Sequence, residues 1–192
     1  CSRKCEFCSV KTKPRWACGQ FLFDQVQWLV ETRNAREFFI VDDRLEEDRE
    51  GTVFFFKKIA QTYGRALSFT VQARLETAED AELLNSMSKA GVSVICIGYE
   101  SPIDEELKAM SKGFNSRDML RWTKMYHHLG FLIHAMFIWG YPSKNTGTFM
   151  LGVKERSKRF KRFIHRAHLD TVQILRAIPL IGTELRARLA KE

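Results

Sequence analysis

The sequence predicts an α/β fold built on a parallel sheet. Short apolar runs of strand length alternate with longer segments whose apolar residues recur at helical spacing. Near-continuous apolar strands between amphipathic helices are typical of parallel sheets that helices cover. No G-x-G-x-x-G motif follows a predicted strand, and several strands end in polar residues, where barrels keep their active sites. We therefore prefer a barrel, or part of one, to an open doubly wound sheet.

The first half of the chain contains two predicted strands between three predicted helices. The elements are, in order, a helix over residues 23–33, a strand over 38–41, a helix over 53–63, a strand over 67–72 and a helix over 78–89. Gly64 and Gly91 end the second and third helices. The run Phe38–Val41 is apolar throughout and therefore predicts a buried strand.

The second half continues the same alternation. Its predicted elements are a strand over 92–98, a helix over 117–128, a strand over 131–139, a helix over 149–167 and a strand over 171–177. No low-complexity segment or linker interrupts them. Five strands alternating with helices in 192 residues predict a single domain, residues 1–192.

Composition excludes several classes of protein. With 45% hydrophobic and 28% charged residues, the chain is neither disordered nor collagen-like. The most apolar segment, Phe131–Trp139, contains His134 and is far shorter than the roughly 20 residues that span a bilayer, so no membrane span is predicted. Three of the five cysteines fall in the first eight residues, which indicates metal binding in a reducing compartment, by default the cytoplasm.

The three clustered cysteines predict a metal centre. Cys1, Cys5 and Cys8 are spaced C-x3-C-x2-C, close enough for one loop to direct three thiolates at one centre. Three ligands leave one iron of a four-iron cluster open to a small molecule, as catalytic metal sites do. The alternative is a structural zinc knuckle completed by Cys18.

These residues resemble the radical SAM superfamily, whose signature is C-x3-C-x-aromatic-C with Phe7 as the aromatic residue here. The similarity continues in FFIVDDRLEED, VICIGYESPIDEELKAMSKGFN, HAMFIWGYP and VQILRAIPLIGTEL. The resemblance is greatest to the class that carries an upstream cobalamin (B12)-binding domain. It implies a partial (β/α)6 TIM-like barrel whose first strand precedes the cysteine loop, so we expect the chain to be a piece of a longer protein.

The resemblance also implies the cofactors and the reaction. Cys1, Cys5 and Cys8 would hold a [4Fe-4S] cluster that binds S-adenosylmethionine and generates a 5′-deoxyadenosyl radical. Cobalamin bound by a domain outside this chain would allow methylation of an unreactive carbon. The expected partners are a small-molecule or lipid-like substrate and an electron-donor protein. The alternatives are a methylthiotransferase-like enzyme that modifies RNA or protein and, from another class, a zinc-stabilised nucleic-acid-binding module.

Further residues are implied to bind S-adenosylmethionine. Asp42 and Asp43 stand where relatives have a Gly-Gly-Glu segment that contacts its amino group, although either could instead cap a helix or form a turn. Glu100, at the end of VICIGYE, matches a position that binds the ribose hydroxyls. No catalytic residue is predicted.

Two basic residues and one apolar residue complete the predicted site. Lys112 aligns with a basic position that pairs with the carboxylate of S-adenosylmethionine, and Arg74 could do the same through a bidentate contact. Ile138 resembles the residue that packs on the adenine, and a plain core role explains its side chain equally well. No role is assigned to Cys18, Cys96 or His134.

The positive charge of the chain is concentrated in one predicted helix. Of the net charge of +8, residues 154–168 contribute seven Lys and Arg and one Glu. Apolar residues share one face of this helix, so the bases would form its outer surface. Nucleic acid is a possible partner for such a surface, but we favour a solvated face or contact with another domain.

Overall fold

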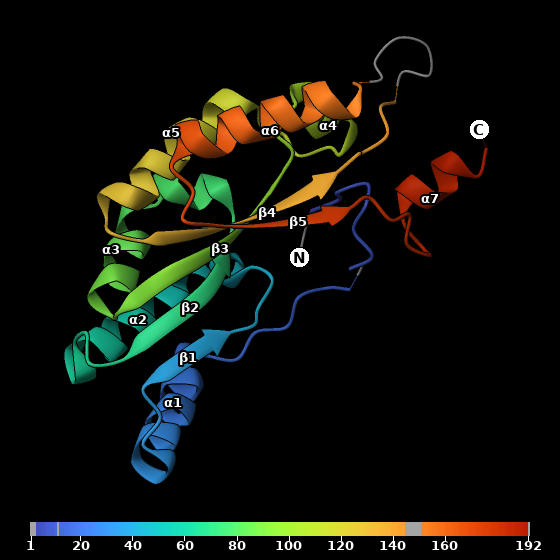
Figure 1. The fold of residues 1–192 in the computed structure, drawn as a ribbon. Coiled ribbons are helices and arrows are strands. Elements are labelled where there is room, and N and C mark those ends of the chain that lie inside the picture. The colour runs from blue at the N-terminus through green and yellow to red at the C-terminus, as the bar shows by residue number, and fades with distance from the viewer. Residues whose placement is uncertain (1–2, 11, 145–150, 192) are drawn as a thin grey trace. The chain divides into compact units, whose positions relative to one another are not determined.

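The computed structural model describes residues 3–10, 12–144 and 151–191 (Figure 1). Its elements, with η for 3-10 helices, are α1 (Gly19–Arg33), β1 (Glu37–Ile40), η1 (Leu45–Glu47), α2 (Arg49–Tyr63), β2 (Ser68–Ala73), η2 (Leu75–Glu79), α3 (Ala81–Lys89), β3 (Val92–Glu100), α4 (Asp104–Ala109), α5 (Ser116–His128), β4 (Leu132–Trp139), α6 (Val153–Ala167), β5 (Thr171–Arg176) and α7 (Glu184–Leu189). The strands form one open parallel sheet in sequence order, β1-β2-β3-β4-β5, which confirms the α/β class.

The chain folds into two compact units. The first unit comprises Cys1–Lys13, Gly98–Arg121 and Ala135–Glu192, and the second comprises Pro14–Ile97 and Trp122–His134. None of the helices in the described residues is long and apolar enough to cross a membrane.

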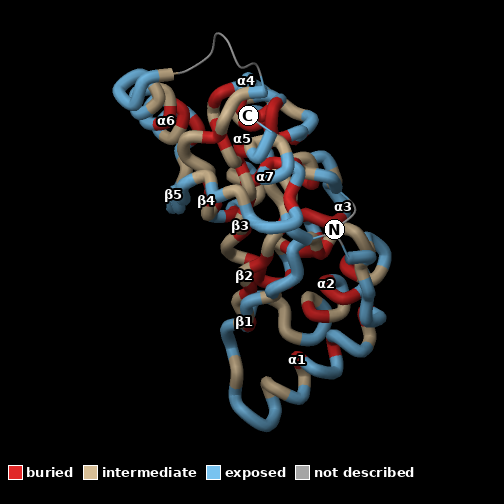
Figure 2. Tube along the Cα trace, turned by 90° about the vertical axis from the view of Figure 1, so that its right-hand side faces the viewer, coloured by how far each residue is buried: buried red, intermediate tan, exposed pale blue. Residues whose placement is uncertain are grey.

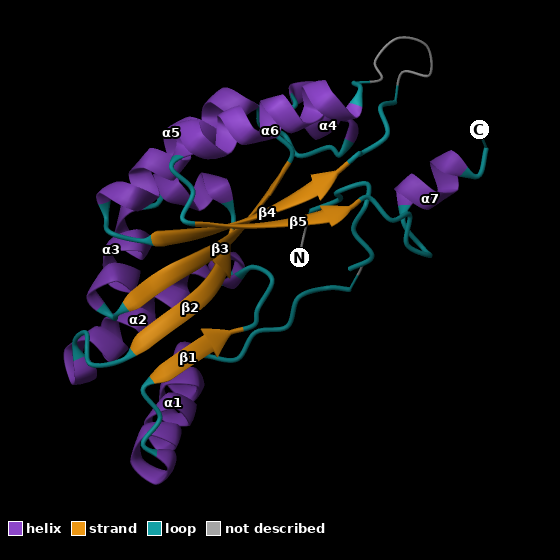
Figure 3. Ribbon diagram, in the orientation of Figure 1, coloured by secondary structure: helices purple, strands orange, loops and turns teal. Residues whose placement is uncertain are grey.

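Parallel strands and aromatic packing build the second unit. Phe38 of β1 lies opposite Phe69 of β2, and their rings stack with centroids 5.1 Å apart. Phe56 of α2 meets Phe69 edge-on at 6.1 Å. Phe69, Val71 and Ala73 alternate along β2 and are all buried, and α2 and α3 cover this face (Figures 2 and 3). The period-two pattern therefore directs one face of β2 into the core.

The start of α3 depends on a capping carboxylate. Asp80 accepts a hydrogen bond from the Leu83 N–H at 3.1 Å and two from Arg49, at 2.5 and 3.0 Å. An N-cap carboxylate satisfies an N–H that the first turn leaves unpaired, so α3 begins at Ala81. The predicted start at Ala78 is wrong because residues 75–79 form η2.

Aromatic rings attach α6 to the strands of the first unit. The ring centroids of Phe160 and Phe163 of α6 lie 5.5 and 6.2 Å from that of Phe137 of β4. The ring centroid of Phe137 lies 5.6 Å from that of Tyr99 of β3. All four side chains are buried. Since buried aromatic pairs stabilise beyond their area alone, this contact fixes α6 against the sheet.

The edge strands and short helices differ from prediction. β1 is only half-buried: Phe39 is 58% exposed whereas Phe38 and Ile40 are half-buried, because side chains alternate between the two faces of a strand and one face of β1 is left uncovered. β5, at the other edge, is exposed along its whole length. The described part of α6 begins at Val153, since Gly152 is extended, and residues 149 and 150 lie outside the described residues. The short helices α4 and α7 were not predicted, because six residues carry too little periodicity.

Candidate cofactor-binding site

Residues 3–10 form the loop of the predicted metal ligands. The Cys8 N–H donates to the Cys5 carbonyl at 3.1 Å, so both cysteines lie on one tight turn. The Val10 N–H donates to Cys8 Sγ at 3.4 Å, and both thiols are free and half-buried. Hydrogen bonds to sulfur support and tune thiolates in iron–sulfur centres. The thiols and this donor therefore fit the predicted cluster.

The third predicted ligand, Cys1, lies outside the described residues. In residues 3–10, 12–144 and 151–191, no three His, Cys, Asp or Glu side chains gather as a metal site. Cys18 is exposed and belongs to the second unit, whereas burial raises the pKa of the half-buried Cys96 thiol. The ligand set Cys1, Cys5 and Cys8 stays a prediction.

The aromatic residue of the cysteine motif anchors the loop to the rest of the first unit. Phe7 meets Tyr141 edge-on with ring centroids 6.2 Å apart. Phe7 and Ile138 pack against one buried cluster that includes Met110, Tyr141 and Leu185. The structure thus places Ile138 in the same packing cluster as the motif, while its contact with adenine stays a prediction.

A buried acidic residue within the motif escaped the sequence analysis. Glu6 is 2% exposed and accepts hydrogen bonds from Tyr141 Oη at 2.6 Å and from Arg188 Nε at 2.8 Å. Burial raises the pKa of Glu6, but the hydrogen bonds from Arg188 and Tyr141 and the charge of Arg188 outweigh it, so the pKa is lowered overall. The pKa of Tyr141 is raised far above its ordinary value, mainly by burial and secondly by the hydrogen bond to Glu6. The only feature of the sequence that could have indicated a role for Glu6 is its position, as a charged residue between two predicted metal ligands.

The structure brings Glu100 and Lys112 together. Lys112 Nζ lies 3.0 Å from Glu100 Oε1, and both side chains are about nine-tenths buried. Glu100 has a φ of 63°, in the left-handed region that non-glycine residues rarely adopt. A Cβ at Gly98 would collide with Glu100 Oε1, so the glycine leaves room for this carboxylate. Such an unusual backbone held by an ion pair is typical of functional sites.

The remaining predicted residues belong to the second unit. Asp42 and Asp43 are exposed and follow β1 in a loop and a turn. This agrees with the alternative interpretation that these residues form a turn. Arg74 follows β2 and pairs with Glu76 at 2.5 Å. Arg74 Nε and Glu46 Oε2 are buried and have no hydrogen-bond partner among the described residues. An unpartnered buried donor and acceptor are the kind of groups that a polar ligand satisfies.

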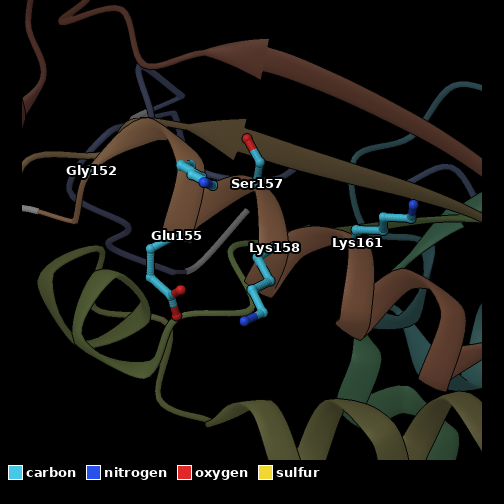
Figure 4. Close-up of a pocket in the computed structure, with 6 residues that line it drawn as sticks. Gly152, Glu155, Ser157, Lys158 and Lys161 are labelled. Carbon is cyan, nitrogen blue, oxygen red and sulfur yellow. The ribbon is translucent and has the colours of Figure 1, made fainter.

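The basic surface of α6 is only partly as predicted. Arg156 is not on the outer surface: its Nε and Nη2 lie 3.1 and 2.8 Å from Oε1 of the buried Glu106. A shallow hollow of about 610 Å³ along α6 is lined by Gly152, Lys154, Glu155, Ser157, Lys158 and Lys161 (Figure 4). No predicted cofactor-binding residue lines this hollow.

No protein-family model matches the chain. The chain is 24% identical over 200 residues to an uncharacterized methyltransferase of Synechocystis sp. and 25% identical over 202 residues to the hopanoid C-2 methylase of Rhodopseudomonas palustris. Each match covers 100% of this chain and 36% of the relative, so the chain spans about a third of their length.

Among solved structures, the chain is similar to the radical S-adenosylmethionine methyltransferase TsrM from Kitasatospora setae, with cobalamin and a [4Fe-4S] cluster bound. The TM-score is 0.78 at 15% identity, over 100% of this chain and 38% of that chain. The shared fold, the methyltransferase relatives and the cysteine motif agree with one another. The chain therefore resembles the radical SAM superfamily and, within it, the cobalamin-dependent enzymes.

Proposed function

We propose that residues 1–192 act as the radical-generating core of a cobalamin-dependent methyltransferase that modifies an unreactive carbon. The observation that carries this proposal is the cysteine loop, where Cys5 and Cys8 share one turn and an amide donates to sulfur. The name of the hopanoid C-2 methylase, which specifies a carbon position, supports methylation and a small-molecule or lipid-like substrate.

The cysteine loop would hold the cluster through Cys1, Cys5 and Cys8. Three thiolates leave one iron free for the amino and carboxylate groups of S-adenosylmethionine. When bound, the cluster and S-adenosylmethionine would supply radical chemistry, with the reduced cluster giving the one electron that breaks a carbon–sulfur bond of S-adenosylmethionine. The task of the chain is then to orient the ligand and to exclude water, and the apolar packing of Phe7 and Ile138 beside the loop suits that task.

Polar groups at the strand ends would orient S-adenosylmethionine. Glu100 would accept hydrogen bonds from the ribose hydroxyls, and Lys112 would pair with the ligand carboxylate; their present ion pair keeps both side chains ordered. The unpartnered Nε of Arg74 offers a second donor for a carboxylate. Asp42 and Asp43, both exposed, would suit the ammonium group.

Anaerobic reconstitution of the full-length protein tests the cluster. The wild type is expected to bind about four irons per chain and to show a paramagnetic signal on reduction that S-adenosylmethionine alters. Cys5→Ser and Cys8→Ser should lose the cluster, while Cys18→Ser, the matched control, should keep it. Stoichiometric zinc without iron would contradict the proposal and support the zinc-stabilised alternative.

Cobalamin and an electron donor are further parts of the proposal. The full-length protein is expected to bind hydroxocobalamin, with the change in its visible spectrum as the readout. A reduced electron-donor protein and a reducing compartment such as the cytoplasm would maintain the cluster. If the protein carries the cluster but binds no cobalamin, the result would contradict the cobalamin-dependent methylation proposed here. It would leave the proposed radical chemistry intact.

A further inference from the structure

We propose that Glu6, Tyr141 and Arg188 form a clamp that positions the cysteine loop for its cluster. The inference rests on the proposed function, since the cluster gives the loop its purpose. The three side chains come from the motif itself, from the segment after β4 and from α7. They are positioning residues, because they act through the cysteines on either side of Glu6.

Arg188 joins two segments through one guanidinium group. Its Nε and Nη2 donate to the two carboxylate oxygens of Glu6 at 2.8 and 3.3 Å. The same group donates to the carbonyls of Pro142 and Ser143 at 3.1 and 3.2 Å. The planar fork of arginine can serve a carboxylate and two carbonyls at once, which the single ammonium of lysine cannot do in this geometry. Arg188 therefore holds the cysteine loop to the segment that follows β4.

Glu6 is held by its backbone as well as by its carboxylate. Its N–H donates to the Met110 carbonyl at 3.2 Å, and its carbonyl accepts from the Leu185 N–H at 3.0 Å. Tyr141 Oη adds a bond of 2.6 Å to the carboxylate. Because Cys5 precedes Glu6 directly and Cys8 follows two residues later, the thiols cannot move far from this anchor unless several bonds break.

The chemistry of the clamp favours positioning over general stability. A buried ion pair is seldom a net gain over apolar packing, because removing both charges from water is costly. Its benefit is a single defined geometry, and here that geometry is imposed between two predicted ligands. Arg188 also offsets the charge of a carboxylate that would otherwise lie unneutralised beside a set of thiolates.

Thiol reactivity in the cluster-free full-length protein tests the clamp directly. Alkylation of each cysteine is followed by peptide mass spectrometry. Arg188→Met should raise the rates at Cys5 and Cys8 about tenfold, as expected when charge-assisted hydrogen bonds are lost. Tyr141→Phe keeps the ring packing and removes one bond, so a smaller rise is expected, and Arg188→Lys should fall between wild type and Arg188→Met.

Two internal controls separate positioning from loosening of the whole fold. Cys96 is half-buried in the second unit, and its rate should stay unchanged. Arg186→Met, an exposed change on the same helix, should leave Cys5 and Cys8 as in the wild type. Unchanged rates at Cys5 and Cys8 in both Arg188→Met and Tyr141→Phe would overturn the clamp. An equal rise at Cys96 in both variants would also overturn it, because it would mean general destabilisation.

Reconstituted protein distinguishes failure of this inference from failure of the proposed function. Wild type that takes up no iron contradicts the proposed function, while alkylation still shows whether the clamp holds the loop. If wild type carries the cluster, the paramagnetic signal of Arg188→Met should change and its iron should pass to a chelator about tenfold faster. A signal and a release rate identical to the wild type would overturn the inference and leave the proposed function intact.

Discussion

Replacing Arg156 with methionine is expected to destabilise the first unit far more than the same change at Lys158. Arg156 contacts Glu106 Oε1 through two nitrogens, and the side chain of Glu106 is only 2% exposed. Lys158 is exposed on the same helix. The variant Arg156→Met keeps a side chain of similar length, so its main effect is to leave a buried carboxylate without its cation.

The expected loss is about 3 kcal/mol. Removing one partner of a buried ion pair typically costs about 3–5 kcal/mol. The lower end applies because Arg156 remains 13% exposed and because the Ser101 hydroxyl, 2.5 Å from Glu106 Oε2, still donates to the carboxylate. In a domain of this size the loss corresponds to a fall in Tm of about 6–12 °C, whereas Lys158→Met should change stability by no more than about 0.5 kcal/mol.

Thermal unfolding followed by circular dichroism measures the difference. The double variant Glu106→Gln, Arg156→Met should recover part of the loss, because the uncompensated charge is gone. If Arg156→Met melts within about 2 °C of Lys158→Met, the buried pair does not exist in solution and the reasoning fails.

Two further predictions concern the ion pair of Asp80 with Arg49 and the packing of Gly98 against Glu100. The hydrogen bonds from Arg49 hold the pKa of Asp80 below its ordinary value, so the pair stabilises the second unit above about pH 4, and this stabilisation is lost as the pH falls through the folded-state pKa. Asp80→Asn should therefore flatten the acid side of the profile of Tm against pH, and a wild-type slope in the variant would refute this. Gly98→Ala should push the carboxylate of Glu100 away from Lys112 at little cost to the fold, because the colliding atom is the end of a side chain. Binding titrations should then show S-adenosylmethionine bound several-fold more weakly, with Glu100→Gln binding between wild type and Glu100→Ala, and undiminished affinity in Gly98→Ala would exclude this role.

The sequence alone was sufficient for features that depend on local pattern. The period of apolar residues distinguishes β2 from α2 and α3, because side chains alternate on a strand and recur every three to four residues on a helix. The spacing of Cys1, Cys5 and Cys8 is equally local, since all three fall within the first eight residues of the sequence. Glu100 and Lys112 were each predicted by resemblance, but their ion pair was not.

Only the tertiary structure decided the contacts that join distant parts of the chain. Glu6 and Arg188 are 182 residues apart, and Glu106 and Arg156 are 50 apart. Nothing in the charge pattern distinguishes Arg156 from the exposed bases of α6, because a helix presents a charged side chain to solvent or to a buried partner depending on what packs beside it. Exposure of β1 and β5, the two edge strands, likewise depends on what packs against their faces, which apolar sequence does not reveal. Periodicity and ligand spacing are determined by residues that are close in the sequence, whereas burial and ion pairing depend on surfaces that meet only after the chain has folded.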